Sequence, residues 1–187
     1  MILIKKRLEK KLKKAGAKLI KAEFLQKRVV FNLPRGHEIP GGWIRIRDEG
    51  DKITMSLKII DGKKMENQKE TLFKISSFKK GEFFLKKIGC QKKAYQESKR
   101  ELWLLDKAEV TIDEWPFLEP FVEIEGKSKK QVKKVAQKLG FDFSKALFCS
   151  VDALYGKKYN LAKEIINNQT PKIIFGKKNP FLKNQKK

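Results

Sequence analysis

Polar and apolar side chains alternate with the two-residue period of β-strands along much of the chain. The clearest case is Trp43-Ile-Arg-Ile-Arg47, in which Arg45 and Arg47 share one face and the two isoleucines share the other. Turn sequences rich in Gly, Pro and Asp separate such segments. The pattern predicts extended segments over residues 18–32, 43–47, 52–58, 68–75, 92–105, 109–113, 121–125 and 172–175.

Other segments repeat their apolar residues with the period of a helix. Ile4 and Leu8 begin an apolar stripe that stops before Gly16, and Ser128 with Gln131 forms a capping box for a later helix. The predicted helices cover residues 4–15, 77–88, 128–139, 152–159 and 161–168. In the second of these, the apolar side is predicted to carry Phe84, Leu85 and Ile88.

Several predicted strands place charged groups on one face and aliphatic groups on the other. Thr54, Ser56 and Lys58 share a face, as do Glu123 and Glu125. An open sheet with one wetted face has this pattern, and so does a closed antiparallel barrel with a polar interior. In either case helices would cover the aliphatic face, so the fold class is α+β.

Composition describes a globular chain with a charged surface. Of 187 residues, 40% are hydrophobic and 36% are charged, and no apolar run approaches the length of a membrane span. The two cysteines, Cys90 and Cys149, and the single histidine, His37, exclude a disulfide scaffold, zinc-finger spacing and a site of several histidines. We therefore expect a cytoplasmic protein without a secretory signal.

Charge is the strongest compositional signal. Lys and Arg number 45 against 22 Asp and Glu, which gives a net charge of +23 and predicts attraction to polyanions. Residues 108–126 nevertheless contain no Lys or Arg. An acidic segment in a basic chain suggests a cation site beside an anion site, although an ordinary acidic sheet face has the same composition.

A series of short motifs then follows in order along most of the chain. It comprises Trp43-Ile-Arg-Ile-Arg47, the strand that ends at Lys58, Lys99-Arg100-Glu-Leu-Trp103, Val110-Thr-Ile-Asp113, Phe121-Val-Glu-Ile-Glu-Gly126 and Leu139-Gly-Phe141. This series resembles the CYTH superfamily, also called the triphosphate tunnel metalloenzymes, which includes class IV adenylate cyclases and thiamine triphosphatases. The ordered series is more specific than any one of its motifs.

The resemblance implies an antiparallel barrel of about eight strands, with helices packed outside and a triphosphate bound in its interior. The matching basic residues, implied to hold phosphate oxygens, are Arg45, Arg47, Lys58 and Arg100. The matching acidic residues, implied to hold Mg²⁺ or Mn²⁺, are Asp113, Glu123 and Glu125, and further candidates for the site are Glu70 and Lys99. No residue is assigned as the catalytic group.

The sequence also departs from the family pattern. The family's first strand carries E-x-E-x-K, whose glutamates help to bind the metal, and this sequence has no glutamate before Glu9. The first strand is therefore expected to be missing or reduced to a stub over residues 1–4, and Ser98 stands where many members have a Lys. We expect one domain over residues 1–175 and a frayed basic tail over residues 176–187.

The expected function is action on a triphosphate with a divalent metal. A class IV cyclase would convert ATP to cyclic AMP and pyrophosphate, and a triphosphatase would hydrolyse ATP, thiamine triphosphate or inorganic triphosphate. The alternative is a barrel that binds polyphosphate or RNA without catalysis. A membrane partner is not expected, nucleic acid is less favoured because carboxylates repel phosphate, and the oligomeric state stays open.

In simpler interpretations, Arg45 and Arg47 form an exposed basic stripe, Glu123 and Glu125 pair with lysines, and Asp113 caps a turn.

Overall fold

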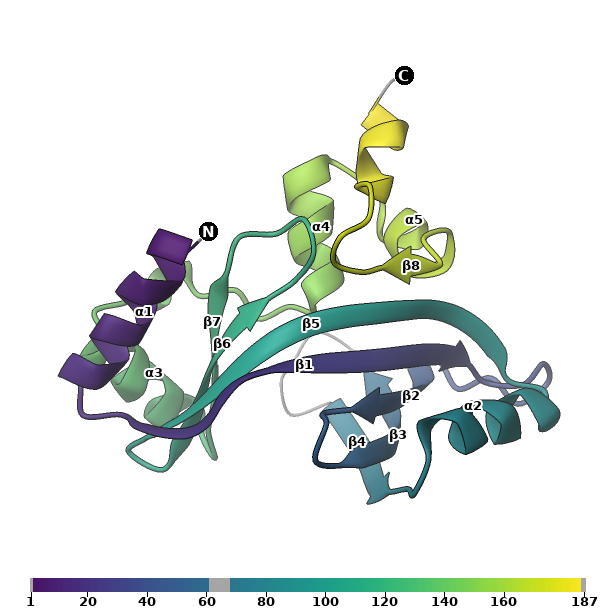
Figure 1. Cartoon of the computed structure of the whole chain (residues 1–187), viewed down its shortest axis with the longest axis horizontal. Helices are drawn as coiled ribbons and strands as arrows, with labels where there is room; N and C mark the ends of the chain where they lie inside the picture. The colour runs from purple at the N-terminus through teal and green to yellow at the C-terminus, as the bar shows by residue number, and fades with distance from the viewer. Residues whose placement is uncertain (1, 61–67, 186–187) are drawn as a thin grey trace. The chain divides into compact units, whose positions relative to one another are not determined.

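The computed structural model describes residues 2–60 and 68–185, and its elements follow the predicted order (Figure 1). The helices are α1 (Ile2–Lys14), α2 (Phe78–Lys87), α3 (Lys129–Lys138), α4 (Val151–Tyr159) and α5 (Lys163–Asn168), with 3₁₀ turns η2 (Phe143–Lys145) and η3 (Pro180–Gln185). The strands are β1 (Lys18–Asn32), β2 (Gly42–Asp48), β3 (Ile53–Ile60), β4 (Gln68–Lys74), β5 (Gln91–Leu105), β6 (Ala108–Glu114), β7 (Phe121–Glu125) and β8 (Lys172–Ile173).

The strands form an antiparallel sheet in the order β4-β3-β2-β1-β5-β6-β7, and the short β8 pairs with β5 in parallel. The α+β fold class, with an antiparallel sheet and accompanying helices, is therefore confirmed. The described chain begins with α1 at Ile2, so residues 2–4 are helical and form no strand stub. None of the described helices combines the length and apolar character needed to cross a membrane.

The chain divides into two compact units, and both long strands contribute to each of them. Unit 1 contains Met1–Leu25 and Ser98–Phe148, and unit 2 contains Gln26–Glu97 and Cys149–Lys187. The single domain over residues 1–175 stays a prediction.

Unit 1 is built on the antiparallel strands β5, β6 and β7. The turn between β5 and β6 consists of Asp106 and Lys107, whose φ angles of 49° and 64° suit the tight two-residue turn of a hairpin. A side chain of α3 holds this turn, since Lys138 Nζ lies 3.0 Å from an Asp106 carboxylate oxygen. One sheet face packs against α1 and α3 (Figure 1), and the buried core consists of Leu12, Trp103, Leu105, Ala108, Val110, Ile112, Val135 and Leu139.

Unit 2 is built on the second part of β1 and the strands β2, β3 and β4. Helix α2 covers the apolar sheet face, and the buried core consists of Val29, Phe31, Ile46, Met55, Leu85 and Cys90. The helix lies close to the sheet at Gly81, where an added Cβ would stand 2.7 Å from Ile75 Cδ1. The opposite face of these strands is polar, and it carries the predicted basic residues.

The C-terminal segment of unit 2 packs through an aromatic residue, and the frayed tail over residues 176–187 stays a prediction. Phe181 in η3 is fully buried, with its ring centroid 4.7 Å from that of Tyr155 and 5.2 Å from that of Tyr159. Asn179 Nδ2 also donates to the Tyr159 hydroxyl at 3.0 Å. Phe181 therefore contributes buried aromatic surface within a stretch whose composition is rich in Lys and Asn.

Candidate functional site

Unit 2 gathers three predicted phosphate-binding residues on one sheet face. We call Arg45 and Arg47 of β2 and Lys58 of β3 the basic cluster. In the antiparallel register Arg45 lies opposite Ser56 and Arg47 opposite Thr54, so all of these side chains share the face opposite the α2 core. The Arg45 and Arg47 side chains are only 13% and 17% exposed, so they do not form an exposed basic stripe.

Glu70 of β4 completes this cluster. Its Oε1 lies 3.2 Å from Arg45 Nη2, and its Oε2 lies 3.0 Å from Lys58 Nζ. The register explains the contact, because Lys58 and Glu70 are direct cross-strand partners. The structure thus brings the additional candidate Glu70 into the cluster, where one carboxylate neighbours two cations.

The three cations of the basic cluster carry more positive charge than the Glu70 carboxylate can offset. The pKa of Lys58 is lowered from its ordinary value of 10.5 by burial and by repulsion from Arg45, while Glu70 acts in the opposite direction. Burial raises the pKa of Glu70, but the hydrogen bond and charge of Lys58, the charge of Arg45 and a hydrogen bond from Ser56 together lower it further, and the net shift is downward. An anion that bound here would relieve the repulsion among the cations.

A buried polar network adjoins the basic cluster through Arg47. Arg47 Nε lies 2.7 Å from Glu49 Oε1, and Gln26 Nε2 donates to the same oxygen at 3.2 Å. Arg28 Nη2 donates in turn to Gln26 Oε1 at 2.7 Å, and Arg28 is the cross-strand partner of Arg47. Gln26, Arg28 and Glu49 were missed in the sequence. A signal was present for two of them, because Gln26 and Arg28 share one face of β1 by strand alternation while Val29 lies on the other face.

Unit 1 places the predicted acidic residues around the guanidinium of Arg100. Arg100 Nε and Nη2 donate to the two Asp113 carboxylate oxygens at 2.6 and 2.8 Å, and Nη2 also donates to Glu123 Oε2 at 2.7 Å. We call Arg100, Asp113, Glu123 and Glu125 the Arg100 cluster. Asp113 is 1% exposed within β6 and also accepts from the Thr111 hydroxyl at 2.9 Å, so it does not cap a turn.

Negative charge is in excess in the Arg100 cluster, whereas positive charge is in excess in the basic cluster. The pKa of Glu123 is raised by burial and by repulsion from Asp113 and Glu125, which together exceed the opposing effect of Arg100. Burial alone would lower the pKa of Arg100, yet its bonds to Asp113 and the charges of Glu123 and Glu125 raise it. Three carboxylates face one guanidinium, so negative charge is in excess.

This excess matches one divalent cation, and carboxylate oxygens are the ligands that Mg²⁺ prefers. The donor chemistry and charge therefore fit such an ion. Across the described residues, however, no three Asp, Glu, His or Cys side chains converge closely enough to hold a metal. Arg100 instead pairs with Asp113 and Glu123. Metal binding by Asp113, Glu123 and Glu125 stays a prediction.

Lys99 lies apart from the Arg100 cluster. Adjacent residues of a strand point to opposite faces, and Lys99 Nζ lies 3.7 Å from Glu23 Oε1. Glu23 also pairs with Lys5 of α1, whose ammonium lies 3.3 Å from Glu101 Oε2. Lys99 therefore belongs to a network that connects α1 to the sheet, and its candidate role in the site stays a prediction.

Unit 2 thus carries a cluster with excess positive charge, and unit 1 carries a cluster with excess negative charge. An α+β protein with a basic cluster and an acidic cluster on its strands is the class that the fold and the site describe. The CYTH domain model matches residues 3–153, which is most of the chain. The chain belongs to the CYTH family.

Solved structures show the same fold at low sequence identity. A protein from Pyrococcus horikoshii is 20% identical with a TM-score of 0.63, and the match covers 74% of this chain and 86% of that one. A candidate adenylate cyclase from Vibrio parahaemolyticus is 10% identical with a TM-score of 0.66, covering 81% and 91%. A candidate adenylyl cyclase from Hippeastrum, described as having a dominant triphosphatase activity, is 16% identical with a TM-score of 0.55, covering 85% and 93%. No curated protein matches the chain.

Proposed function

We propose that this CYTH protein binds a triphosphate with Mg²⁺ or Mn²⁺ and hydrolyses its terminal phosphoanhydride bond. The observation that carries the proposal is the basic cluster, in which burial and neighbouring cations lower the pKa of Lys58. Such a cluster is stabilised by a ligand of high negative charge, and a triphosphate is a compact ligand of that kind. Water would attack the terminal phosphorus and the bridging P–O bond would break, so that the diphosphate is the leaving group, orthophosphate is released and the water proton passes to solvent or to a product oxygen.

In this proposal the basic cluster holds phosphate oxygens. Arg45 and Arg47 offer planar forks that suit two oxygens at once, and Lys58 supplies a compact charge beside them. Glu70 limits the positive charge in the absence of ligand, since it lies within 3.2 Å of both Arg45 and Lys58. Ligand binding would hold the proton on Lys58 by replacing repulsion with attraction.

The carboxylates of the Arg100 cluster, Asp113, Glu123 and Glu125, would hold the divalent ion. When bound, such an ion would neutralise phosphate charge as the P–O bond breaks. Arg100 would hold Asp113 in its orientation, because two of its N–H groups donate to that carboxylate. The Arg100 side chain is 21% exposed, and the expectation that it binds phosphate stays a prediction.

Cyclisation of ATP is the second candidate, and the Vibrio parahaemolyticus relative, named as a candidate adenylate cyclase, supports it. The two reactions differ in the nucleophile. In cyclisation the ribose 3′-hydroxyl attacks the α-phosphorus and pyrophosphate leaves. We rank hydrolysis first because the Hippeastrum relative is described as having dominant triphosphatase activity. The alternative without catalysis is a protein that only binds polyphosphate or RNA.

The test compares products and variants with one panel of substrates. Orthophosphate, pyrophosphate and cyclic AMP are measured with ATP, thiamine triphosphate and tripolyphosphate, each with Mg²⁺, with Mn²⁺ and with a chelator. We expect metal-dependent orthophosphate release that falls in Arg45→Ala and Arg47→Ala and is unchanged in Lys133→Ala, a surface lysine of α3. Cyclic AMP as the main product would favour cyclisation. Binding without any product would favour the alternative without catalysis.

A further inference from the structure

Helix α2 presents aromatic side chains to solvent rather than to the core. Only Gly81 and Leu85 of this helix are buried, while Phe83 and Phe84 are 63% and 57% exposed. Ile88, which caps the helix, is 47% exposed. The sequence pattern predicted Phe84, Leu85 and Ile88 on the apolar side of this helix, but of these three only Leu85 is buried, because the sheet contacts the side that carries Gly81 and Leu85.

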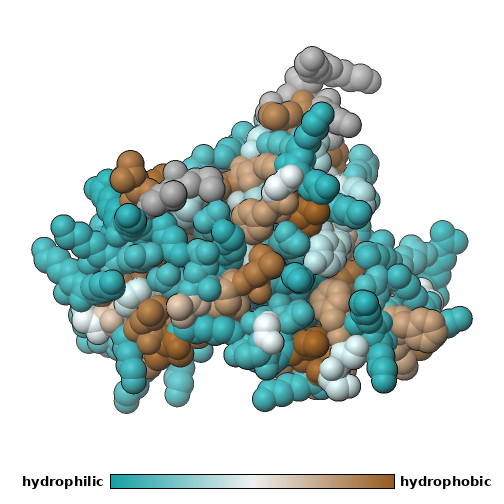
Figure 2. Space-filling model, in the orientation of Figure 1, coloured by the Kyte–Doolittle hydropathy of each residue, from teal (hydrophilic) through white to brown (hydrophobic). Residues whose placement is uncertain are grey.

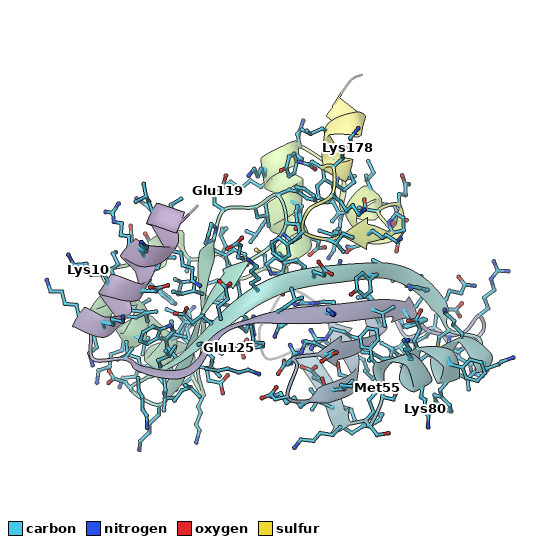
Figure 3. The ribbon with its side chains drawn as sticks, in the orientation of Figure 1. Lys10, Met55, Lys80, Glu119, Glu125 and Lys178 are labelled. Carbon is cyan, nitrogen blue, oxygen red and sulfur yellow. The ribbon has the colours of Figure 1, made fainter. Side chains whose placement is uncertain are left out.

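The same helix carries a high density of positive charge. Lys79 and Lys80 precede the two phenylalanines, and Lys86 and Lys87 follow them, all with exposed side chains. The single acid, Glu82, already pairs with Lys86 and with Lys92, each at 2.9 Å. We call Phe83, Phe84, Ile88 and these four lysines the α2 patch. Figure 2 shows brown and tan side chains among teal ones over α2, and Figure 3 labels Lys80 on the helix.

We infer that the α2 patch is an interaction surface for an anionic membrane, on which the protein would lie without crossing it. Exposed aromatic and aliphatic groups bordered by lysines are the side chains with which interfacial helices enter the headgroup region. Anionic headgroups complement the charge of the lysines. The apolar side chains move out of water and insert between the acyl chains. This proposal revises the sequence-based expectation of no membrane partner, and it does not depend on the proposed triphosphatase activity.

Two observations favour a lipid surface over other polyanions or a second copy of the chain. Lys87 Nζ lies 5.3 Å from the centroid of the Phe83 ring, so a lysine already covers one ring face on which a nucleotide base would stack. Ile88 offers no ring for stacking. A second copy would bring four more lysines against these four, and like charges at such an interface repel.

The principal test is co-sedimentation of the full chain with vesicles. One set consists of phosphatidylcholine alone and the other of equal amounts of phosphatidylcholine and phosphatidylserine. We expect binding to the anionic set only, reduced by salt. Phe83→Ser/Phe84→Ser should weaken it roughly ten-fold or more, because the buried apolar area is lost. Lys79→Gln/Lys80→Gln should weaken it by roughly five-fold per lysine.

Matched controls separate this surface from general basicity. Leu147→Ser/Phe148→Ser removes two other exposed apolar residues, 60% and 53% exposed, and Lys133→Gln/Lys134→Gln removes two exposed lysines of α3. Both should bind the anionic vesicles as the wild type does. If all four double variants bind alike, or if the phenylalanine variant keeps wild-type binding, the proposal is overturned and the attraction is non-specific.

A gain-of-signal variant makes the test independent of lost binding. Phe84→Trp should show a blue shift of its added fluorescence with the anionic vesicles and none with phosphatidylcholine alone. The same variants are assayed with a single-stranded RNA. If the phenylalanine variant loses RNA binding while vesicle binding is unchanged, the surface recognises nucleic acid, and the membrane proposal is wrong.

Discussion

Arg100 of β5 lies directly opposite Asp113 of β6, and its guanidinium donates to both oxygens of that carboxylate at 2.6 and 2.8 Å. The pair is the fixed centre of the Arg100 cluster, because the Thr111 hydroxyl also donates to Asp113. Glu123 and Glu125 contribute further negative charge around it. The cluster is therefore rigid at Asp113 and carries unbalanced charge at the glutamates.

Removing the Asp113 charge should destabilise the protein. In Asp113→Asn the guanidinium loses its bidentate partner, and we expect the free energy of unfolding to fall by ~1.5–3 kcal/mol. Asp106→Asn is the control, because it removes a carboxylate paired with Lys138 in an exposed turn. That change should cost less than ~1 kcal/mol. Urea denaturation measures both, and equal losses would contradict the structural role given to Asp113.

Neutralising Glu70 should strengthen triphosphate binding. Glu70→Gln leaves Arg45 and Lys58 without the carboxylate that opposes their charge, so tripolyphosphate affinity should rise roughly three- to ten-fold at neutral pH. Because Glu70 raises the pKa of Lys58, the variant should lose affinity on the alkaline side at a lower pH than the wild type. Titration calorimetry across pH measures both effects. A fall in affinity at neutral pH would instead assign Glu70 to binding the cation of the ligand.

Glu123 should make stability depend on pH in the acid range. Its folded-state pKa is raised above the ordinary 4.5, so the folded protein retains a proton that the unfolded chain has lost. The stabilising contribution is full below pH 4.5 and is lost as pH rises through the raised pKa. In the Glu123→Gln variant, stability should change less with pH over this range. At pH values above the raised pKa, the variant should be more stable than the wild type. Melting temperatures across pH provide the measurement, and parallel profiles would show that Arg100 offsets the repulsion fully.

The same variant tests the proposed metal ligands. Mg²⁺ should raise the melting temperature of the wild type, and more so with tripolyphosphate, since ligands that bind only the folded state stabilise it. Glu123→Gln and Glu125→Gln should lose this response. Glu114→Gln is the matched control and should keep it, because Glu114 follows Asp113 on β6, points to the other face and lies opposite Lys99. If the wild type and all three variants respond alike, these carboxylates are structural and hold no metal.

The packing of α1 on unit 1 gives a prediction about stability alone. Leu12 is 1% exposed among Trp103, Val110 and Leu139, so Leu12→Ala should lower the free energy of unfolding by ~2–5 kcal/mol. Leu3→Ala, on the same helix at 83% exposure, should change it by less than ~0.5 kcal/mol. Chemical denaturation compares the two. Similar small losses would mean that α1 is only loosely attached to the sheet.

Local sequence patterns were enough to predict most of the helices and strands and the face on which many side chains lie. Strand alternation is a local property, so the pattern alone assigns Arg45 and Arg47 to one face and Ile46 to the other. The capping box was predictable for the same reason, and the Gln131 backbone N–H does donate a hydrogen bond to Ser128 Oγ, 3.3 Å away. The ordered motifs then indicated the CYTH family, which the match over residues 3–153 confirms.

Which polar groups meet, and which apolar groups stay exposed to water, depends instead on how the elements pack together. The pairing of Glu70 with Arg45, and of Glu49 with Gln26, depends on strand register between segments far apart in sequence. The burial of Phe181 and the exposure of Phe83 and Phe84 follow from which surfaces the sheet and neighbouring helices cover. Periodicity describes one element at a time, whereas contacts and burial depend on the element that packs against it.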